Sequence, residues 1–177
     1  MAAFDPSDEL NHPLDYELVQ NSFVTMFWRQ EILRTTTTWL QEHGYVVVTI
    51  DTGDWVDEGD LHRDIAAALR FPDYYGRNFD ALNDCLSDVA AGDYGADPNA
   101  TGFVLVLLRY DRYAARQPGP AHRLLDIFAS QARNAALFGH RMMCLVQSDD
   151  PKLAFPALGA TSAEWNRAEW LNSNRGL

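Results

Sequence analysis

The most informative pattern in the sequence lies in residues 71–89, which read Phe71-Pro-Asp-Tyr-Tyr-Gly-Arg-Asn-Phe-Asp-Ala-Leu-Asn-Asp-Cys-Leu-Ser-Asp-Val89. Asn78 is a favourable N-cap residue, and Asp80 would lie in the first turn, where the positive end of the helix dipole favours an acid. Apolar side chains then recur at helical spacing, as Phe79, Leu82, Cys85, Leu86 and Val89. The pattern predicts an amphipathic helix over Phe79–Val89 that directly follows a turn.

The polar side chains of this helix gather on its opposite face, as Asp80, Asn83, Asp84 and Ser87. Asp80 and Asp84 lie one turn apart and repel each other, and residues 79–89 contain no basic residue to neutralise them. A cation from outside the helix could do so, although the residues alone are also compatible with an ordinary solvated face. Tyr74-Tyr75-Gly76 is likewise compatible with a turn packed by aromatic rings.

Strand-like and helical patterns alternate on both sides of this helix. The strand-like runs are Phe23–Trp28, Tyr45–Asp51, Phe103–Leu108 and Met142–Gln147. Helical patterns cover residues 32–40, 61–69 and 121–138. Gly44 and Gly139 are suited to terminate the first and the last of these helices. This alternation predicts the α/β class, with a small parallel β-sheet flanked by helices.

The segments between these elements predict one domain over residues 1–177. Residues 91–102 and 117–120 have the composition of loops, and neither resembles an interdomain linker. Near the end of the chain, Thr161 and Glu164 fit the capping box of a short terminal helix. We expect Trp165 and Trp170 to hold this tail against the body of the protein.

The charge is negative and unevenly distributed. The formal net charge is −11 over 177 residues, and residues 51–100 alone contain twelve acidic and three basic residues. Binding to nucleic acid requires basic residues along the phosphates, so we expect no nucleic-acid partner. An acidic surface favours a basic partner, although it also keeps a protein soluble.

The sequence indicates a cytoplasmic protein with reduced cysteines. The longest uncharged apolar run, Gly102–Leu108, is far shorter than the roughly 20 residues of a membrane-spanning helix, and we expect no membrane association. The first twenty residues contain five acids and neither Lys nor Arg, unlike a signal peptide. Cys85 and Cys144 are interpreted as small buried hydrophobes.

No familiar catalytic or metal-binding motif occurs in the sequence. It contains no glycine-rich phosphate loop, no G-x-S-x-G and no H-E-x-x-H. The acidic run at residues 51–60 fails the calcium-loop template, because Val56 and Ile65 would occupy ligand positions. We expect a solvated turn there, with Asp60 capping a helix that begins at Leu61. The five histidines form no close ligand pair and are expected at the surface or hydrogen-bonded: His12, His43, His62, His122 and His140. We expect no cofactor and no metal.

Residues 71–86 closely resemble the segment that characterises the barstar family of intracellular ribonuclease inhibitors. The resemblance extends over residues 45–147 and includes three of the predicted strands. Residues 1–44 are then an N-terminal extension with an added βα unit that supplies a fourth strand, and residues 148–177 are a C-terminal tail. The resemblance implies an immunity protein, not an enzyme, that inserts a helix and its preceding loop into the basic active site of a secreted ribonuclease or ribonuclease-type toxin.

The resemblance also implies a set of partner-binding positions. Tyr74, Gly76 and Asn78 match the binding loop, and Asp80 and Asp84 match the two acidic contacts, with Asp84 the central one. The remaining expected contact positions are Arg77, Asn83, Ser87, Ile127 and Ser130.

Three of these positions depart from the pattern of the family. The family's type member carries tryptophan at the position of Asn83 and an acid at the position of Ser130. Arg77 places a positive charge where a cationic cleft would repel it. These departures bear on the identity of the target more than on the mode of binding.

Two other functions stay open at this point. Asp80 and Asp84 could act as general acid and base, or as ligands of a divalent metal. Alternatively, the chain could be an interaction or scaffold protein that has the barstar fold without inhibitory activity.

Overall fold

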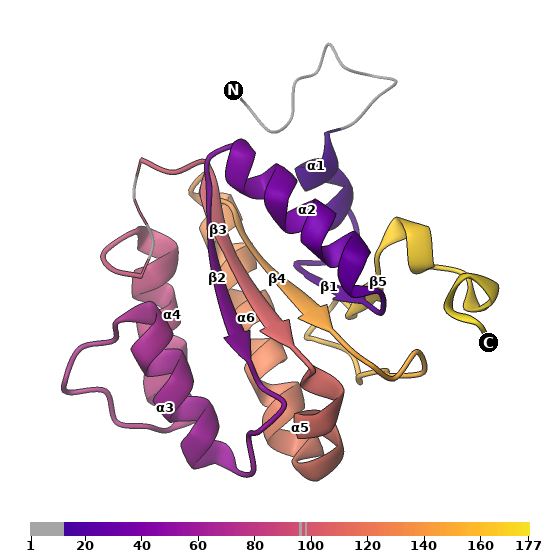
Figure 1. The fold of residues 1–177 in the computed structure, drawn as a ribbon. Helices are drawn as coiled ribbons and strands as arrows, with labels where there is room; N and C mark the ends of the chain where they lie inside the picture. Colours follow the sequence, from indigo (N-terminus) through magenta and orange to yellow (C-terminus); the bar gives the residue numbers. More distant parts are fainter. Residues whose placement is uncertain (1–12, 96, 98) are drawn as a thin grey trace.

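The computed structural model describes residues 13–95, 97 and 99–177, and it contains a five-stranded, all-parallel sheet between two layers of helices (Figure 1). The strands are β1 (Val24–Phe27), β2 (Tyr45–Asp51), β3 (Gly102–Leu108), β4 (Met142–Gln147) and β5 (Glu164–Trp165). Their order in the sheet is β2-β3-β4-β1-β5. The predicted α/β class is confirmed, and the strand of the N-terminal extension does join the sheet, where Val24 lies beside Cys144.

Six α-helices flank the sheet in the described part of the chain. They are α1 (Leu14–Val19), α2 (Gln30–Glu42), α3 (Glu58–Leu69), α4 (Phe79–Ala91), α5 (Tyr110–Arg116) and α6 (Pro118–Leu137). Figure 1 shows α1 and α2 on one side of the sheet, with α6 on the other. Apolar residues of α3, α4 and α5 belong to the same buried cluster as those of α6.

The sheet is buried on both faces because its strands are apolar at consecutive positions. In β3, the side chains of Phe103, Leu105 and Leu107 join the cluster under α3–α6. Val104 and Val106 point the other way and pack with residues of α1 and α2. Continuous apolar strands of this kind are typical of parallel sheets covered by helices on both sides. Cys144 of β4 is fully buried and Cys85 of α4 is nearly so, and both are free thiols, which confirms their interpretation as packing residues.

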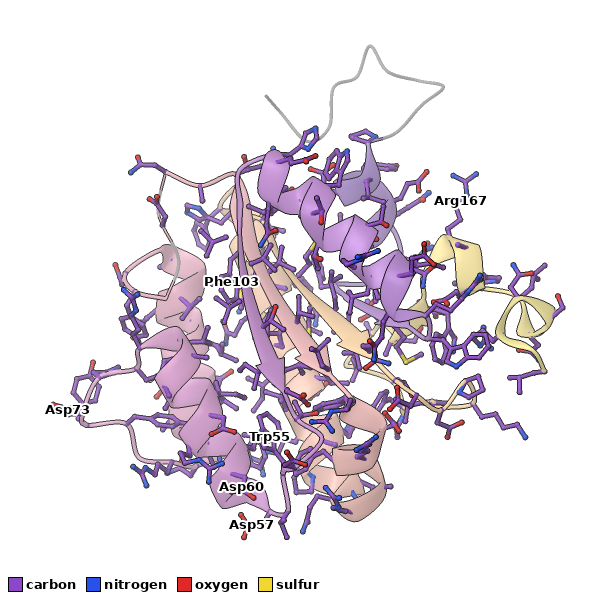
Figure 2. All side chains as sticks on the ribbon, viewed as in Figure 1. Trp55, Asp57, Asp60, Asp73, Phe103 and Arg167 are labelled. Carbon is purple, nitrogen blue, oxygen red and sulfur yellow. The ribbon has the colours of Figure 1, made fainter. Side chains whose placement is uncertain are left out.

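Two of the predicted helix caps, at the end of α2 and the start of α4, are present in the structure, and the predicted cap of α3 is not. Gly44 follows α2 with φ = +82°, a left-handed conformation that glycine adopts without strain. Asn78 caps α4 as predicted, because its side-chain oxygen accepts a hydrogen bond from the Ala81 amide at 2.9 Å. The prediction for α3 is wrong: the helix begins at Glu58, and Asp57 caps it by accepting from the amide of Asp60. Figure 2 shows both acids at this end of α3.

One predicted loop is also wrong, and two short helices were not predicted. Residues 117–120 do not form a loop, because α6 already begins at Pro118. Proline is favoured at the first position of a helix, where its missing N–H has no partner to lose. The short helices α1 and α5 are additional elements that the sequence patterns did not predict.

The C-terminal tail forms a strand and two short 3₁₀ helices instead of the single short helix that the capping box at Thr161 predicted. Glu164 and Trp165 form β5, which pairs with Thr25 and Met26 of β1. The 3₁₀ segments η1 (Arg167–Glu169) and η2 (Asn172–Arg175) follow. Trp165 packs on the core as expected, whereas Trp170 stays 49% exposed.

A buried carboxylate fastens this tail to the end of β1. Glu169 is fully buried, and its two oxygens accept from the backbone amides of Trp28 and Arg29, each at 2.9 Å. They also accept from Nε of Arg29 at 3.1 Å and from Nδ2 of Asn166 at 2.5 Å. The carboxylate therefore satisfies two main-chain donors where β1 turns into α2.

None of the helices in the described part of the chain is sufficiently long and apolar to cross a membrane.

Candidate partner-binding face

One side of helix α4 is buried in the core, and the other side faces solvent, where a partner could bind it. Phe79, Leu82, Cys85, Leu86 and Val89 are all buried, as the amphipathic pattern predicted. On the opposite side, Asp80, Asp84 and Ser87 are exposed, while Asn83 is half-buried. We use the name contact face for these four residues together with the loop residues Tyr74, Gly76, Arg77 and Asn78.

The loop before α4 is anchored by one tyrosine and exposes the other. Tyr75 is buried, and its hydroxyl lies 2.6 Å from Nδ1 of His62 in α3. Tyr74, its neighbour, is 80% exposed. Asn78 adds a second restraint, because its side-chain amide donates to the carbonyl of Gly76 at 3.3 Å while its oxygen caps α4. The loop thus presents Tyr74 from a fixed backbone.

Two further features shape this loop. Arg77 has φ = +49°, in the left-handed region, and its side chain is exposed. A Cβ atom at Gly76 would lie 3.1 Å from the Asn78 side-chain nitrogen, so a larger residue there would require the side chain that caps α4 to shift by a few tenths of an ångström. The sequence therefore places glycine where the loop folds back on its own helix.

His62 differs from the expectation of a surface or fully hydrogen-bonded histidine. Its ring is buried against those of Tyr75 and Phe79, with centroid distances of 5.8 and 5.1 Å. Within the described residues, its buried Nε2 has no hydrogen-bond partner. Burial lowers the pKa of His62, which keeps the ring neutral at pH 7, and burial likewise raises the pKa of Tyr75.

Helix α6 forms a wall beside the contact face. Nε2 of Gln131, which is buried, donates to Oδ1 of Asn83 at 2.7 Å. The guanidinium of Arg123 lies 4.8 Å above the ring of Phe79, and its Nη2 lies 3.6 Å from Oδ1 of Asp80. The two expected contact positions on α6, Ile127 and Ser130, are half-buried. The sequence prediction did not include Arg123 or Gln131, although Arg123, Ile127 and Gln131 recur at i, i+4 and i+8 on one side of α6.

The acids of α4 differ in what surrounds them. Asp80 has Arg123 as a neighbour, which supplies the outside cation that the sequence left open. The carboxylate of Asp88 accepts from the hydroxyl of Tyr94 at 2.9 Å. For Asp84, the described part of the chain offers no Lys, Arg or His nitrogen within 4.0 Å. Asp84 is therefore an exposed carboxylate that no cation of the described chain pairs.

The other acidic cluster, at residues 51–60, forms ion pairs inside the protein. Both oxygens of Asp51 accept from Arg109 at 2.7 Å, and these hydrogen bonds lower the pKa of Asp51. Asp60 accepts from the amide of Val56 at 2.8 Å and pairs with Arg63. Among residues 13–95, 97 and 99–177, no group of three or more His, Cys, Asp or Glu side chains is placed to hold a metal ion.

Comparison with known proteins assigns this arrangement to a family. The sequence model described as Barstar (barnase inhibitor) matches residues 31–147, about two-thirds of the chain. The chain belongs to the barstar family. The match begins inside α2 and ends with β4, so β1, β5 and the tail fastened by Glu169 lie outside it.

One curated relative shares a shorter stretch with this barstar-family chain. The protein named "Putative ribonuclease inhibitor YrdF", from Bacillus subtilis (strain 168), is 52% identical over 40 residues. These residues are 23% of this chain and 44% of the relative, so the match spans less than half of the relative's length.

Proposed function

We propose that this barstar-family protein inhibits a ribonuclease by placing α4 and the preceding loop in the active-site cleft of the enzyme. A ribonuclease cleft must hold phosphates, so it is lined with cations. Carboxylates on a rigid helix can occupy the phosphate positions and pair with these cations. The target is a secreted ribonuclease or a ribonuclease-type toxin, and the producing cell is protected in the cytoplasm.

The observation that carries this proposal is the unpaired carboxylate of Asp84 on the exposed side of a helix whose other side is buried. An exposed acid without an internal partner contributes little to the fold, yet it is free to meet an external cation without first breaking an ion pair. The loop before α4 supports the same binding mode. Tyr75 anchors the loop in the core, and its neighbour Tyr74 is exposed next to the first turn of α4.

The experiment measures the rate at which barnase cleaves RNA while increasing amounts of this protein are added. Barnase is the enzyme named in the family description. We expect the cleavage rate to fall with increasing inhibitor, and Asp84→Asn to weaken inhibition by at least about 100-fold, since it leaves desolvated cations of the cleft unpaired. Glu31→Gln is the matched control, because Glu31 is an exposed acid on α2, across the sheet from α4.

Equal inhibition by the parent and by Asp84→Asn would contradict the proposed binding mode. If the parent neither inhibits nor binds barnase or other secreted ribonucleases, the chain is an interaction protein with the barstar fold. Cleavage of RNA by the protein alone would favour the enzymatic use of Asp80 and Asp84.

A further inference from the structure

Arg123 of α6 lies beside the contact face and places a positive charge next to its acids. Two contacts hold its guanidinium in place: the ring of Phe79, 4.8 Å below it, and the carboxylate of Asp80, at 3.6 Å. Phe79 is itself 7% exposed and fixed in the core. The positive charge is therefore positioned against the first turn of α4 instead of extending freely into solvent.

The pair that Arg123 forms with Asp80 adds little to the stability of the fold. The side chain of Asp80 is 97% exposed and that of Arg123 is 58% exposed. Exposed ion pairs with a long separation contribute almost nothing to folding, because water screens them and both side chains lose freedom. The ion pair with Asp80 therefore does not explain the placement of Arg123 by stability, although it changes the charge that a partner meets at Asp80.

We propose that Arg123 is a specificity-determining residue, which attenuates binding to clefts that are uniformly positive opposite Asp80. This inference rests on the proposed function and adds a division of roles within the contact face. Asp84 carries the attraction, because no cation of the described chain pairs it. Asp80 and Arg123 together present a charge close to zero. A cation of the partner opposite Asp84 then raises the affinity, and a second cation opposite Asp80 lowers it.

Helix geometry places this residue at the edge of the face. Arg123 precedes Ile127 by one turn and Gln131 by two turns, and Gln131 contacts Asn83 in the middle of the α4 face. A partner that covers Asp80 and Asn83 must therefore also lie against Arg123. A positive charge on the partner opposite Arg123 would repel the guanidinium, so replacing Arg123 with a neutral residue should strengthen binding.

The test is a charge series at residue 123, measured against barnase by titration calorimetry and stopped flow. We expect Arg123→Gln to tighten binding about tenfold and Arg123→Glu to tighten it further, mainly through faster association, while Arg123→Lys stays near the parent. The gain should shrink as the salt concentration rises. Arg133→Gln is the matched control, because Arg133 lies ten residues further along α6 and faces Gly159, where a Cβ would be 3.3 Å from its Nη2. It should change the affinity less than about twofold, since it lies outside the face.

The outcomes separate this inference from the proposed function. If Asp84→Asn abolishes binding while Arg123→Gln binds no tighter than the parent, the role of Arg123 is refuted and the inhibitory mode stands. If Arg123→Glu binds barnase and the parent does not, attenuation by Arg123 is supported directly. An absence of binding by the parent and by all three variants contradicts both ideas. Thermal unfolding of each variant checks that the loss of the contact with Phe79 has not altered the fold.

Discussion

The buried carboxylate of Glu169 offers a sharp test of what holds the C-terminal tail in place. Its oxygen Oε1 accepts from the amide and from Nε of Arg29, and Oε2 accepts from the Trp28 amide and from Asn166. The substitution Glu169→Gln keeps the shape of the side chain but replaces one oxygen with an NH₂ group. That group would face two donors, so two of the four hydrogen bonds are lost and two donor–donor contacts replace them.

The size of the effect follows from the burial and the charge. Charge-assisted hydrogen bonds contribute roughly 1.5–3 kcal/mol each, and disruption of a buried charged group costs about 3–5 kcal/mol in total. We therefore expect Glu169→Gln to lower the free energy of unfolding by about 3–5 kcal/mol. For a chain of this length, each kcal/mol corresponds to about 2–4 °C in Tm, so the midpoint should fall by roughly 6–20 °C.

Urea unfolding followed by circular dichroism measures this change, with Glu31→Gln as the exposed control. Hydrogen exchange adds a local readout, because the amides of Trp28 and Arg29 should lose protection first if only the tail detaches. A loss below about 1 kcal/mol, with protection of these two amides unchanged, would show that Glu169 does not fasten the tail to β1.

Three more predictions concern pH, the cysteines and salt. Because the pKa of His62 is lowered in the folded state, the unfolded chain binds its proton more readily, so stability is complete above about pH 6.5 and declines as the pH falls below it. The urea midpoints of unfolding at pH 7.5 and 5.5 should differ less for His62→Gln than for the parent. Equal differences in the two proteins would exclude His62 as the source of the pH dependence. The double variant Cys85→Ala, Cys144→Ala should keep the parent's affinity for barnase and lose about 1–3 kcal/mol of unfolding free energy, since each change removes one buried heavy atom. Abolished binding by a folded double variant would contradict the packing role. The association rate with barnase should fall as salt rises while the dissociation rate changes little, and stopped-flow rates indifferent to salt would indicate that the net charge of −11 serves solubility alone.

The sequence predicted those parts of the fold whose signals are local and repeated. The run Tyr45–Asp51 corresponds to β2 without a shift, and Asn78 caps α4 because its own side chain reaches the Ala81 amide. The strand β5 escaped prediction because two residues cannot show an alternating pattern. Thr161 and Glu164 imitate a capping box there, yet they are used for a bridge to Leu158 and for pairing with β1.

The contact face shows the same limit at the level of side chains. Its acids could be placed on one side of α4 from their spacing alone, since helix periodicity determines that side. The contacts of Arg123 with Asp80 and of Gln131 with Asn83 join residues more than forty positions apart. They depend on how α6 lies against α4, and no local pattern contains that information. The same holds for His62, whose burial under the loop requires Tyr75 to fold back over α3.

The place of β1 in the sheet has a consequence for the edge of β4 in this chain. The stretch that matches the family ends with β4, whose residues are all buried, and the extension lays β1 along it, with the Cys144 amide donating to Phe23 at 2.8 Å. A fragment trimmed to residues 31–147 would expose this apolar strand as a row of unpaired main-chain donors and acceptors, which is a template for self-association. With residues 13–30 and 148–177 present, this side of the sheet ends instead at β5, a strand of two residues followed by 3₁₀ turns, and the edge opposite β2 is too short for another molecule to extend.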